Sequence, residues 1–247
     1  NGVLNASMPN PYYDVGSNNT TQGLVGYWPL NNDTLDYALG NNGTQNGGVN
    51  CGTGVSGKVG SACSFDGTDD KITMSGVATT TTFTISAWIN GGPSADTYGL
   101  IVGEAGGSEF YWMGDTRKLN YYYGGSHLSN TAISNNVWHH IGMTNNGGAV
   151  TFYVDGLADG TSRGAPGFTA NTIGDNAINT ESFNGIIDEV AIWNRSLSAN
   201  EIASLYWGSV TGGSVLNASQ TSTGDGWQVE ITPCDADSCG TPANSSS

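Results

Sequence analysis

Positively charged side chains are rare in this sequence. Only 6 of its 247 residues are Lys or Arg, against 21 Asp and Glu, which gives a formal net charge of -15. Nucleic acids and anionic membrane surfaces are bound by clustered Lys and Arg, so the composition argues against both as partners. Cations and neutral glycans are the ligand classes that it leaves open.

Long apolar runs and metal-type cysteine spacing are also missing. No run of 18 apolar residues is present, so we expect no membrane insertion. The four cysteines form two close pairs without C-x-x-C spacing, and we expect two local disulfides, Cys51–Cys63 and Cys234–Cys239. Disulfides persist in oxidising compartments, which predicts an extracellular or cell-surface protein.

What the chain does contain is glycine and turn-forming polar residues. The sequence has 38 Gly and only 11% charged residues, a composition that favours turns over long helices. We therefore expect an all-β fold. Hydrophobic residues make up 37% of the chain, which is enough for a substantial core.

The most informative stretch runs from Ser182 to Tyr206. Residues 186–193 alternate as a central strand, and strict alternation places Asp188 and Glu189 on opposite faces. A capping box and a hydrophobic staple follow and predict a helix of about two turns, ending near Tyr206. The residues of these two motifs are Ser198 with Glu201, and Leu197 with Ile202.

Three motifs in this chain resemble laminin-G-like, concanavalin A-type jelly-roll domains. They are G-x-I-D-E-V-x-I-W-N-R-x-L-S-x-x-E-I from Gly185, G-K-x-G-x-A-x-x-F-D-G-x-D-D from Gly57, and the W-H-H and F-Y-V-D-G strands within 138–156. The resemblance covers about residues 23–207. It implies a jelly-roll β-sandwich over 23–208 with one short C-terminal helix. The composition of the flanking residues predicts an extended arm at 1–22 and a strand-containing tail with a small disulfide loop at 209–247.

The resemblance also raises calcium as a cofactor. In that family the opening strand is followed by an Asp and an S-G-N-x-x-x-G-T loop that helps to hold calcium, whereas residues 36–44 read D-Y-A-L-G-N-N-G-T. It implies calcium ligands at Asp36, Asn41 and Asp188, because the first and last strands of the jelly roll pair. A metal-free turn and a hydrogen-bonded structural carboxylate are the alternatives. The aspartates of residues 66–70 are either a second cation site or solvated turn residues.

Aromatic residues concentrate in three short predicted strands between Tyr98 and Tyr123. Among them Trp112 and Tyr122 are candidates for stacking on sugar rings, with core packing as the alternative. His139 and His140 are adjacent, so they point to opposite faces and are expected to be structural. Glycan hydrolases of this fold need two carboxylates about 5 to 10 Å apart. The strand acids here are isolated, and we expect no enzyme.

Both ends of the chain carry the same pentapeptide, V-L-N-A-S, at Val3–Ser7 and Val215–Ser219. We therefore expect a non-enzymatic structural or adhesive module that self-associates or joins neighbouring surface domains through its arms, as in a cell-surface filament. A lectin-like, carbohydrate-binding domain is the alternative. N-x-[ST] sequons predict glycosylation of at least one of these residues: Asn5, Asn18, Asn19, Asn32, Asn42, Asn194, Asn217 and Asn244.

Overall fold

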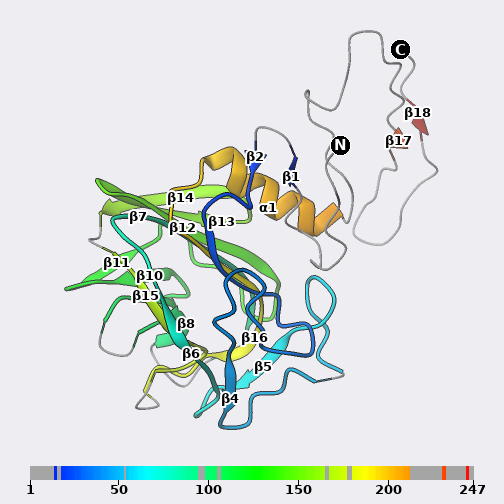
Figure 1. Cartoon of the computed structure of the whole chain (residues 1–247), viewed down its shortest axis with the longest axis vertical. Helices are drawn as coiled ribbons and strands as arrows, with labels where there is room; N and C mark the ends of the chain where they lie inside the picture. The colour runs from blue at the N-terminus through cyan, green and yellow to red at the C-terminus, as the bar shows by residue number, and fades with distance from the viewer. Residues whose placement is uncertain are drawn as a thin grey trace. The chain divides into compact units, whose positions relative to one another are not determined.

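A computed structural model describes residues 14–15, 18–52, 54–93, 98–104, 107–164, 167–176, 180–211, 230–231 and 243–244. The chain divides into two compact units, Asn1–Asp14 with Asn18–Ser214 and Val15–Ser17 with Val215–Ser247. The first unit holds two seven-stranded antiparallel sheets and one helix (Figure 1). Two short strand pairs complete the described elements: β1 (Asp14–Val15) with β2 (Asn18–Asn19), and β17 (Glu230–Ile231) with β18 (Ala243–Asn244).

One sheet, which we call the β9 sheet, has the order β11-β10-β9-β8-β15-β6-β4. Three of its strands confirm those expected between Tyr98 and Tyr123. The bounds are β4 (Thr44–Asn46), β6 (Lys71–Ala78), β8 (Tyr98–Gly103), β9 (Glu109–Met113), β10 (Leu119–Tyr122), β11 (Ser126–Leu128) and β15 (Thr169–Ile173).

The other sheet, the β7 sheet, has the order β14-β13-β12-β7-β16-β3, with β5 also paired to β16. The first long strand, β3, pairs with the last, β16, as expected, and β3 ends before Pro29 at a sheet edge. The bounds are β3 (Leu24–Trp28), β5 (Cys63–Asp66), β7 (Thr82–Gly91), β12 (His139–Asn146), β13 (Ala149–Val154), β14 (Leu157–Arg163) and β16 (Asn184–Trp193).

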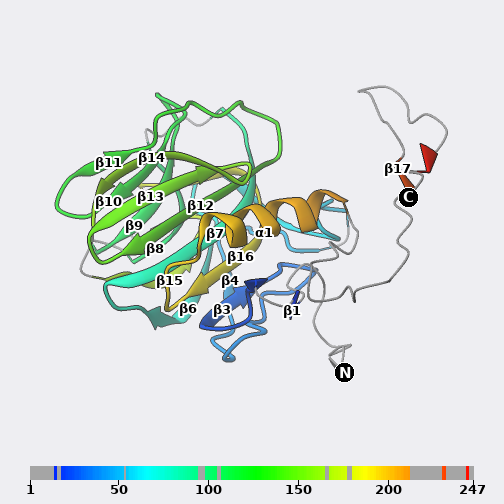
Figure 2. The same cartoon turned by 90° about the horizontal axis from the view of Figure 1, so that it is seen from above.

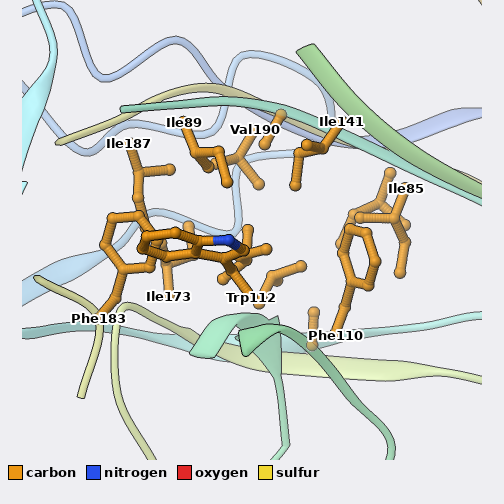
Figure 3. Packing of buried hydrophobic residues seen from close by; sticks show 14 of the residues in the cluster. Ile85, Ile89, Phe110, Trp112, Ile141, Ile173, Phe183, Ile187 and Val190 are labelled. Atoms are coloured by element: carbon orange, nitrogen blue, oxygen red, sulfur yellow. The ribbon is translucent and has the colours of Figure 1, made fainter. Parts of the chain in front are cut away.

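The core lies between the two sheets (Figure 3). Phe83, Ile85, Ala87 and Ile89 of β7 point into it, as their alternation predicts. Figure 3 shows Trp112 of the β9 sheet lying between the sheets, and its ring centroid is 6.1 Å from that of Phe183. The expectation that Trp112 offers its ring to a ligand is therefore wrong: the side chain is 1% exposed.

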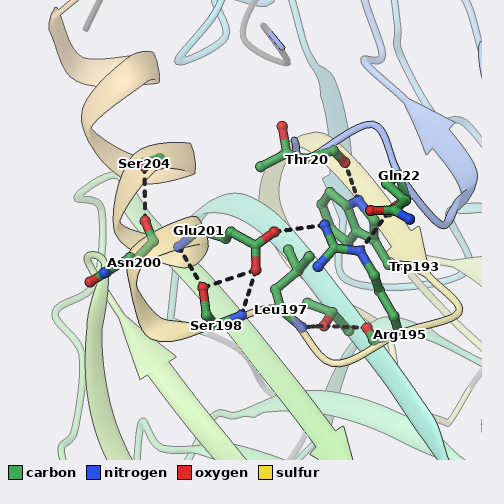
Figure 4. Close-up of polar contacts among 10 residues, drawn as sticks. Thr20, Gln22, Trp193, Arg195, Leu197, Ser198, Asn200, Glu201 and Ser204 are labelled. Carbon is green, nitrogen blue, oxygen red and sulfur yellow. Dashed lines mark hydrogen bonds and ion pairs between the residues drawn. The ribbon is translucent and has the colours of Figure 1, made fainter. Parts of the chain in front are cut away.

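The helix α1 (Ala199–Thr211) packs on the outer face of the β7 sheet (Figure 2). Its predicted capping box is confirmed, because Ser198 N donates to Glu201 Oε2 (2.7 Å) and Glu201 N to Ser198 Oγ (3.3 Å). Arg195 Nη2 donates to the other carboxylate oxygen of Glu201 at 2.7 Å (Figure 4). The staple residues Leu197 and Ile202 share a small buried cluster with Tyr27 and Trp193. The helix is longer than the two turns expected.

Strand β16 departs from the predicted alternation at one residue. Its register to β7 shifts between Asp188 and Ala191, and Glu189 has φ 55, the left-handed conformation. Such a β-bulge places one extra residue in the strand and turns its side chain. Asp188 pairs with Trp88, and Glu189 contacts Tyr27, so both acids lie on the helix side of the β7 sheet. The expectation of opposite faces is wrong.

The disulfide Cys51–Cys63 is present, and it closes the loop that precedes β5. Cys234 and Cys239 lie outside the described residues, as do Asn5 and Asn217. Of the other predicted glycosylation positions, Asn32, Asn42 and Asn194 are exposed. Asn18 and Asn19 form strand β2, and Asn244 lies in strand β18. Among the described residues, no helix combines the length and apolar character needed to cross a membrane.

The predicted division at 1–22, 23–208 and 209–247 stays a prediction. Most of the arm and of the tail lies outside the described residues.

Candidate functional site

The outer face of the β9 sheet carries tyrosines and polar side chains. Because Phe110 and Trp112 point into the core, Tyr111 points outward, and pairing places side chains of β8 and β10 beside it. We call this set the tyrosine face: Tyr98, Glu109, Tyr111, Asn120 and Tyr122. The sequence indicated only Tyr122 of these five.

Exposure differs along the tyrosine face. Glu109, Tyr111 and Asn120 are buried, Tyr98 is half-buried, and Tyr122 is 41% exposed. The rings of Tyr98 and Tyr111 lie 5.4 Å apart at an interplanar angle of 50°. Aromatic rings are therefore available at the margin of this face, with polar groups at its centre.

Two carboxylates, Glu109 and Glu181, lie close to the Tyr111 hydroxyl at the centre of the tyrosine face. The Tyr111 hydroxyl donates a short hydrogen bond to Glu109 Oε2. Burial, followed by this bond and by the charges of Glu109 and Glu181, raises the pKa of Tyr111, so its hydroxyl stays protonated. Glu181 Oε2 is buried and has no hydrogen-bond partner among the described residues. A ligand with hydroxyl donors would satisfy that oxygen.

The loop that the sequence predicts as a calcium site is fixed by hydrogen bonds to the Asp36 carboxylate. Asp36 Oδ1 accepts from the backbone N–H groups of Tyr27 (2.8 Å) and Ala38 (2.9 Å). Asp36 Oδ2 accepts from Asn41 N at 2.8 Å, from Asn41 Nδ2 and from Leu39 N. The structure thus brings Asp36 and Asn41 together, whereas no described contact joins Asp188 to either of them.

Asp188 and Glu189 are both buried on the helix side of the β7 sheet, where Val59 N of the loop that precedes β5 donates to Asp188 Oδ2 at 3.0 Å. Burial raises the pKa of Asp188 to about 7, against the lowering effect of backbone hydrogen bonds. Burial, with the nearby charge of Asp188, raises the pKa of Glu189 well above its usual value. Neither side chain forms an ion pair with a described residue.

The aspartates of residues 66–70 form the acidic cluster that the sequence indicated. Carboxylate oxygens of Asp66, Asp69 and Asp70 lie within 4.8 Å of one another. Asp70, the buried member, accepts hydrogen bonds from Gly48 N and from Asp66 N (2.8 Å). Its two oxygens are used to hold the turn, and the other two residues are exposed.

One arrangement was not expected from the sequence. Ser134 Oγ lies 2.8 Å from His139 Nε2, and His139 Nδ1 lies 2.9 Å from Asp155 Oδ2. These contacts have the order of a Ser-His-Asp catalytic triad. However, Asp155 Oδ1 also accepts from His140 N at 3.0 Å, so the acid holds the β13–β14 turn against β12. Ser134 is exposed on its own turn, where water has access.

A family model described as the concanavalin A-like lectin/glucanases superfamily matches residues 66–203. The chain belongs to this superfamily. The expected all-β, jelly-roll-like sandwich is thereby confirmed, together with the resemblance to laminin-G-like domains. No curated protein sequence matches the chain.

Solved structures show how widely this concanavalin A-like fold is shared. Domain 4 of AbnA, an extracellular arabinanase from Geobacillus stearothermophilus solved in complex with arabinotriose, has a TM-score of 0.62 at 18% identity, covering 74% of this chain and 98% of that one. The binding domain of Paraclostridial Mosquitocidal Protein 1 gives 0.55 at 19% identity, covering 75% and 52%. The botulinum neurotoxin serotype D binding domain gives 0.54 at 14%, covering 76% and 52%. The chain therefore spans about half of each toxin domain.

Proposed function

We propose that this protein is a non-catalytic, extracellular carbohydrate-binding domain that takes a neutral glycan on its tyrosine face. The observation that carries the proposal is an exposed aromatic ring, Tyr122, on the same face as a buried carboxylate oxygen, Glu181 Oε2, that accepts no hydrogen bond from the described residues. Sugar rings offer C–H faces to aromatic side chains and hydroxyl groups to carboxylates.

Electrostatics favour a neutral ligand over an acidic one. The chain has only 6 Lys and Arg, and two carboxylates, Glu109 and Glu181, lie near the Tyr111 hydroxyl. An acidic sugar would meet like charges there, which costs binding free energy. A neutral oligosaccharide can donate hydroxyl hydrogen bonds to the same oxygens.

A structural neighbour supports this assignment. The AbnA domain, which the chain covers almost completely, was solved with arabinotriose bound. At 18% identity the likeness establishes the fold, and it makes short neutral oligosaccharides, arabinan fragments included, a reasonable first set of ligands to test.

The filament hypothesis stays a prediction. It depends on the arm at 1–22 and the tail at 209–247, and most of both lies outside the described residues. Electron microscopy of the full chain tests it directly, since a filament subunit would form regular fibres and a free binding domain would give separate particles.

A glycan array followed by calorimetry with the strongest neutral oligosaccharide tests the lectin-like function. Tyr122→Ala should weaken binding about 10-fold or more, equivalent to about 1.4 kcal/mol, because the stacking ring is lost. Tyr122→Phe, which keeps the ring, should bind within about 3-fold of the parent protein.

Leu157→Ala is the matched control, since Leu157 is an exposed side chain on the other sheet. Its binding should equal that of the parent. Absence of any binding by the parent protein, or equal loss in Tyr122→Ala and Leu157→Ala, would exclude the tyrosine face as a glycan site.

A further inference from the structure

The hairpin between β12 and β13 carries one of the six Asn-Gly dipeptides of the sequence, at Asn146–Gly147. In such a dipeptide the glycine nitrogen can attack the side-chain carbonyl carbon of the asparagine, because glycine has no side chain to obstruct the approach. The two groups belong to adjacent residues, so the reaction is intramolecular and needs no enzyme to bring them together. Its course in a folded chain depends on the room around the glycine and on the contacts of the asparagine side chain.

Four of the five described Asn-Gly dipeptides are closely packed at the glycine. A Cβ placed on the glycine probes the space around it, and in these four it would lie between 2.2 and 2.6 Å from another atom. The four are Gly43, Gly47, Gly91 and Gly185. Gly91 and Gly185 are also paired with each other between β7 and β16, which fixes their backbone. The sixth dipeptide, at Asn1, lies outside the described residues.

Gly147 has more room than these four glycines. The atom nearest to a Cβ placed on it is Thr81 O, at 3.6 Å, which is an ordinary contact. Asn146, Gly147 and Gly148 are all exposed, so water reaches the whole tip of the hairpin. The backbone of this dipeptide is therefore free to rearrange for ring closure.

The side-chain carbonyl of Asn146 is already polarised by two backbone donors. Gly148 N and Ala149 N donate to Asn146 Oδ1 at 2.9 and 2.8 Å. When a nitrogen attacks Cγ, negative charge develops on Oδ1, and N–H groups at this distance stabilise such an oxyanion. The attacking nitrogen is held as well, because Gly147 N donates to Asn145 Oδ1 at 3.2 Å.

We propose that Asn146 is a self-modification site, at which the folded chain converts the side-chain amide into a carboxylate. The Gly147 nitrogen forms a bond to Asn146 Cγ and passes its proton through water to Nδ2. The Cγ–Nδ2 bond breaks, and Nδ2 leaves as ammonia. Water then opens the cyclic imide at either of its two carbonyl carbons. One opening gives aspartate, and the other gives isoaspartate, in which the main chain runs through Cγ.

Both products change the tip of the hairpin. Aspartate at position 146 keeps an acceptor for the two N–H donors and adds one negative charge to a chain whose formal net charge is already -15. Isoaspartate adds an atom to the main chain at the residue that pairs with Thr82 of β7. The charge and the register of this hairpin therefore change with time after folding.

Peptide mass spectrometry of the full, disulfide-intact chain tests the proposal. The protein is incubated at neutral pH and physiological temperature, digested at intervals, and analysed for peptides that gain the mass difference between an amide and a carboxylate. Asn146 should convert at least about 5-fold faster than Asn46, because two N–H donors stabilise its oxyanion. An isoaspartate-specific methyltransferase should label the peptide that contains position 146.

Asn46–Gly47 is the matched control within the same molecule, since both of its residues are exposed. The Asn46 side chain is held through Nδ2, which donates to Thr44 O at 2.8 Å and to Thr73 Oγ1 at 3.0 Å. A Cβ on Gly47 would lie 2.6 Å from Asp69 O. In urea these differences are lost, so the two asparagines should convert at rates within about 2-fold of each other.

Asn146→Ser is the variant control. It keeps a side-chain oxygen for the turn and has no amide to lose, so its hairpin peptide should show no gain in mass. Three results would overturn the proposal. They are an unmodified Asn146 in the folded parent, equal rates at Asn146 and Asn46 in the folded parent, and a preference for Asn146 that persists unchanged in urea.

Discussion

Protonation of His140 should limit the stability of this protein in mild acid. His140 is 2% exposed; its Nε2 contacts Ser86 Oγ at 2.8 Å, and its Nδ1 has no partner among the described residues. Burial lowers the pKa of His140 to about 4, although the charge of Asp155 acts in the opposite direction. The neutral ring is therefore the form that the fold accommodates.

The direction in which pH changes the stability follows from the linkage between proton binding and folding. The pKa in the folded state is below the unfolded value of about 6.5, so the unfolded chain binds the extra proton first. The contribution of neutral His140 is fully present above pH 6.5 and is lost as the pH falls toward 4. At about 1.4 kcal/mol per pKa unit, roughly 2.5 kcal/mol should be lost by pH 4.5.

Asp188 has the opposite effect on the pH profile. Its folded pKa of about 7 lies above the unfolded value of 3.8, so its burial destabilises the fold less as the pH falls through that window. Glu189 acts in the same direction. The two trends offset each other in the parent protein, and only a comparison with a His140 variant separates them.

The assay is urea unfolding in EDTA at pH 7.5, 6.0 and 4.5, for the parent and for His140→Gln. The difference in unfolding free energy between the two should shrink by roughly 2.5 kcal/mol from pH 7.5 to 4.5. His139→Gln, at the half-buried neighbouring position, is the control for a general effect of removing an imidazole. A difference that stays constant across this pH range would refute the buried, neutral state of His140.

Two further outcomes are expected. Trp112→Ala should lower the unfolding free energy by about 3 to 5 kcal/mol in a urea titration, because it leaves a cavity between the sheets, and a loss below about 1 kcal/mol would contradict its burial. Ser134→Ala should leave the rate of chromogenic ester hydrolysis at the parent's background level, since Ser134 is exposed on its own turn and Asp155 also holds the β13–β14 turn; turnover that depends on Ser134 would show a hydrolase instead.

Much of the fold was predictable because local signals agreed with one another. The three strands between Tyr98 and Tyr123, the strand at residues 186–193 and the capping box of Ser198 each appear where the sequence placed them. In each case a single periodicity or cap is compatible with only one arrangement.

The direction of Trp112 could not be read in the same way. Strand β9 is E-F-Y-W-M, in which Phe110 and Trp112 alternate with Tyr111 and Met113. Both sets are apolar, so a period of two identifies the strand without telling which set faces the core. The tyrosine face became visible only when pairing with β8 and β10 fixed that direction.

The position of Glu189 was hidden for a different reason. Alternation assumes one residue per step, and a bulge adds a residue without a glycine or proline to mark it. The single extra residue converts a core-facing acid into the neighbour of Asp188, beneath a loop closed by a disulfide. The signal for this bulge in the sequence was the presence of two adjacent acids in a central strand. Neither carboxylate can face a hydrocarbon core unpaired, so a local break in the alternation is the arrangement most compatible with burial of both.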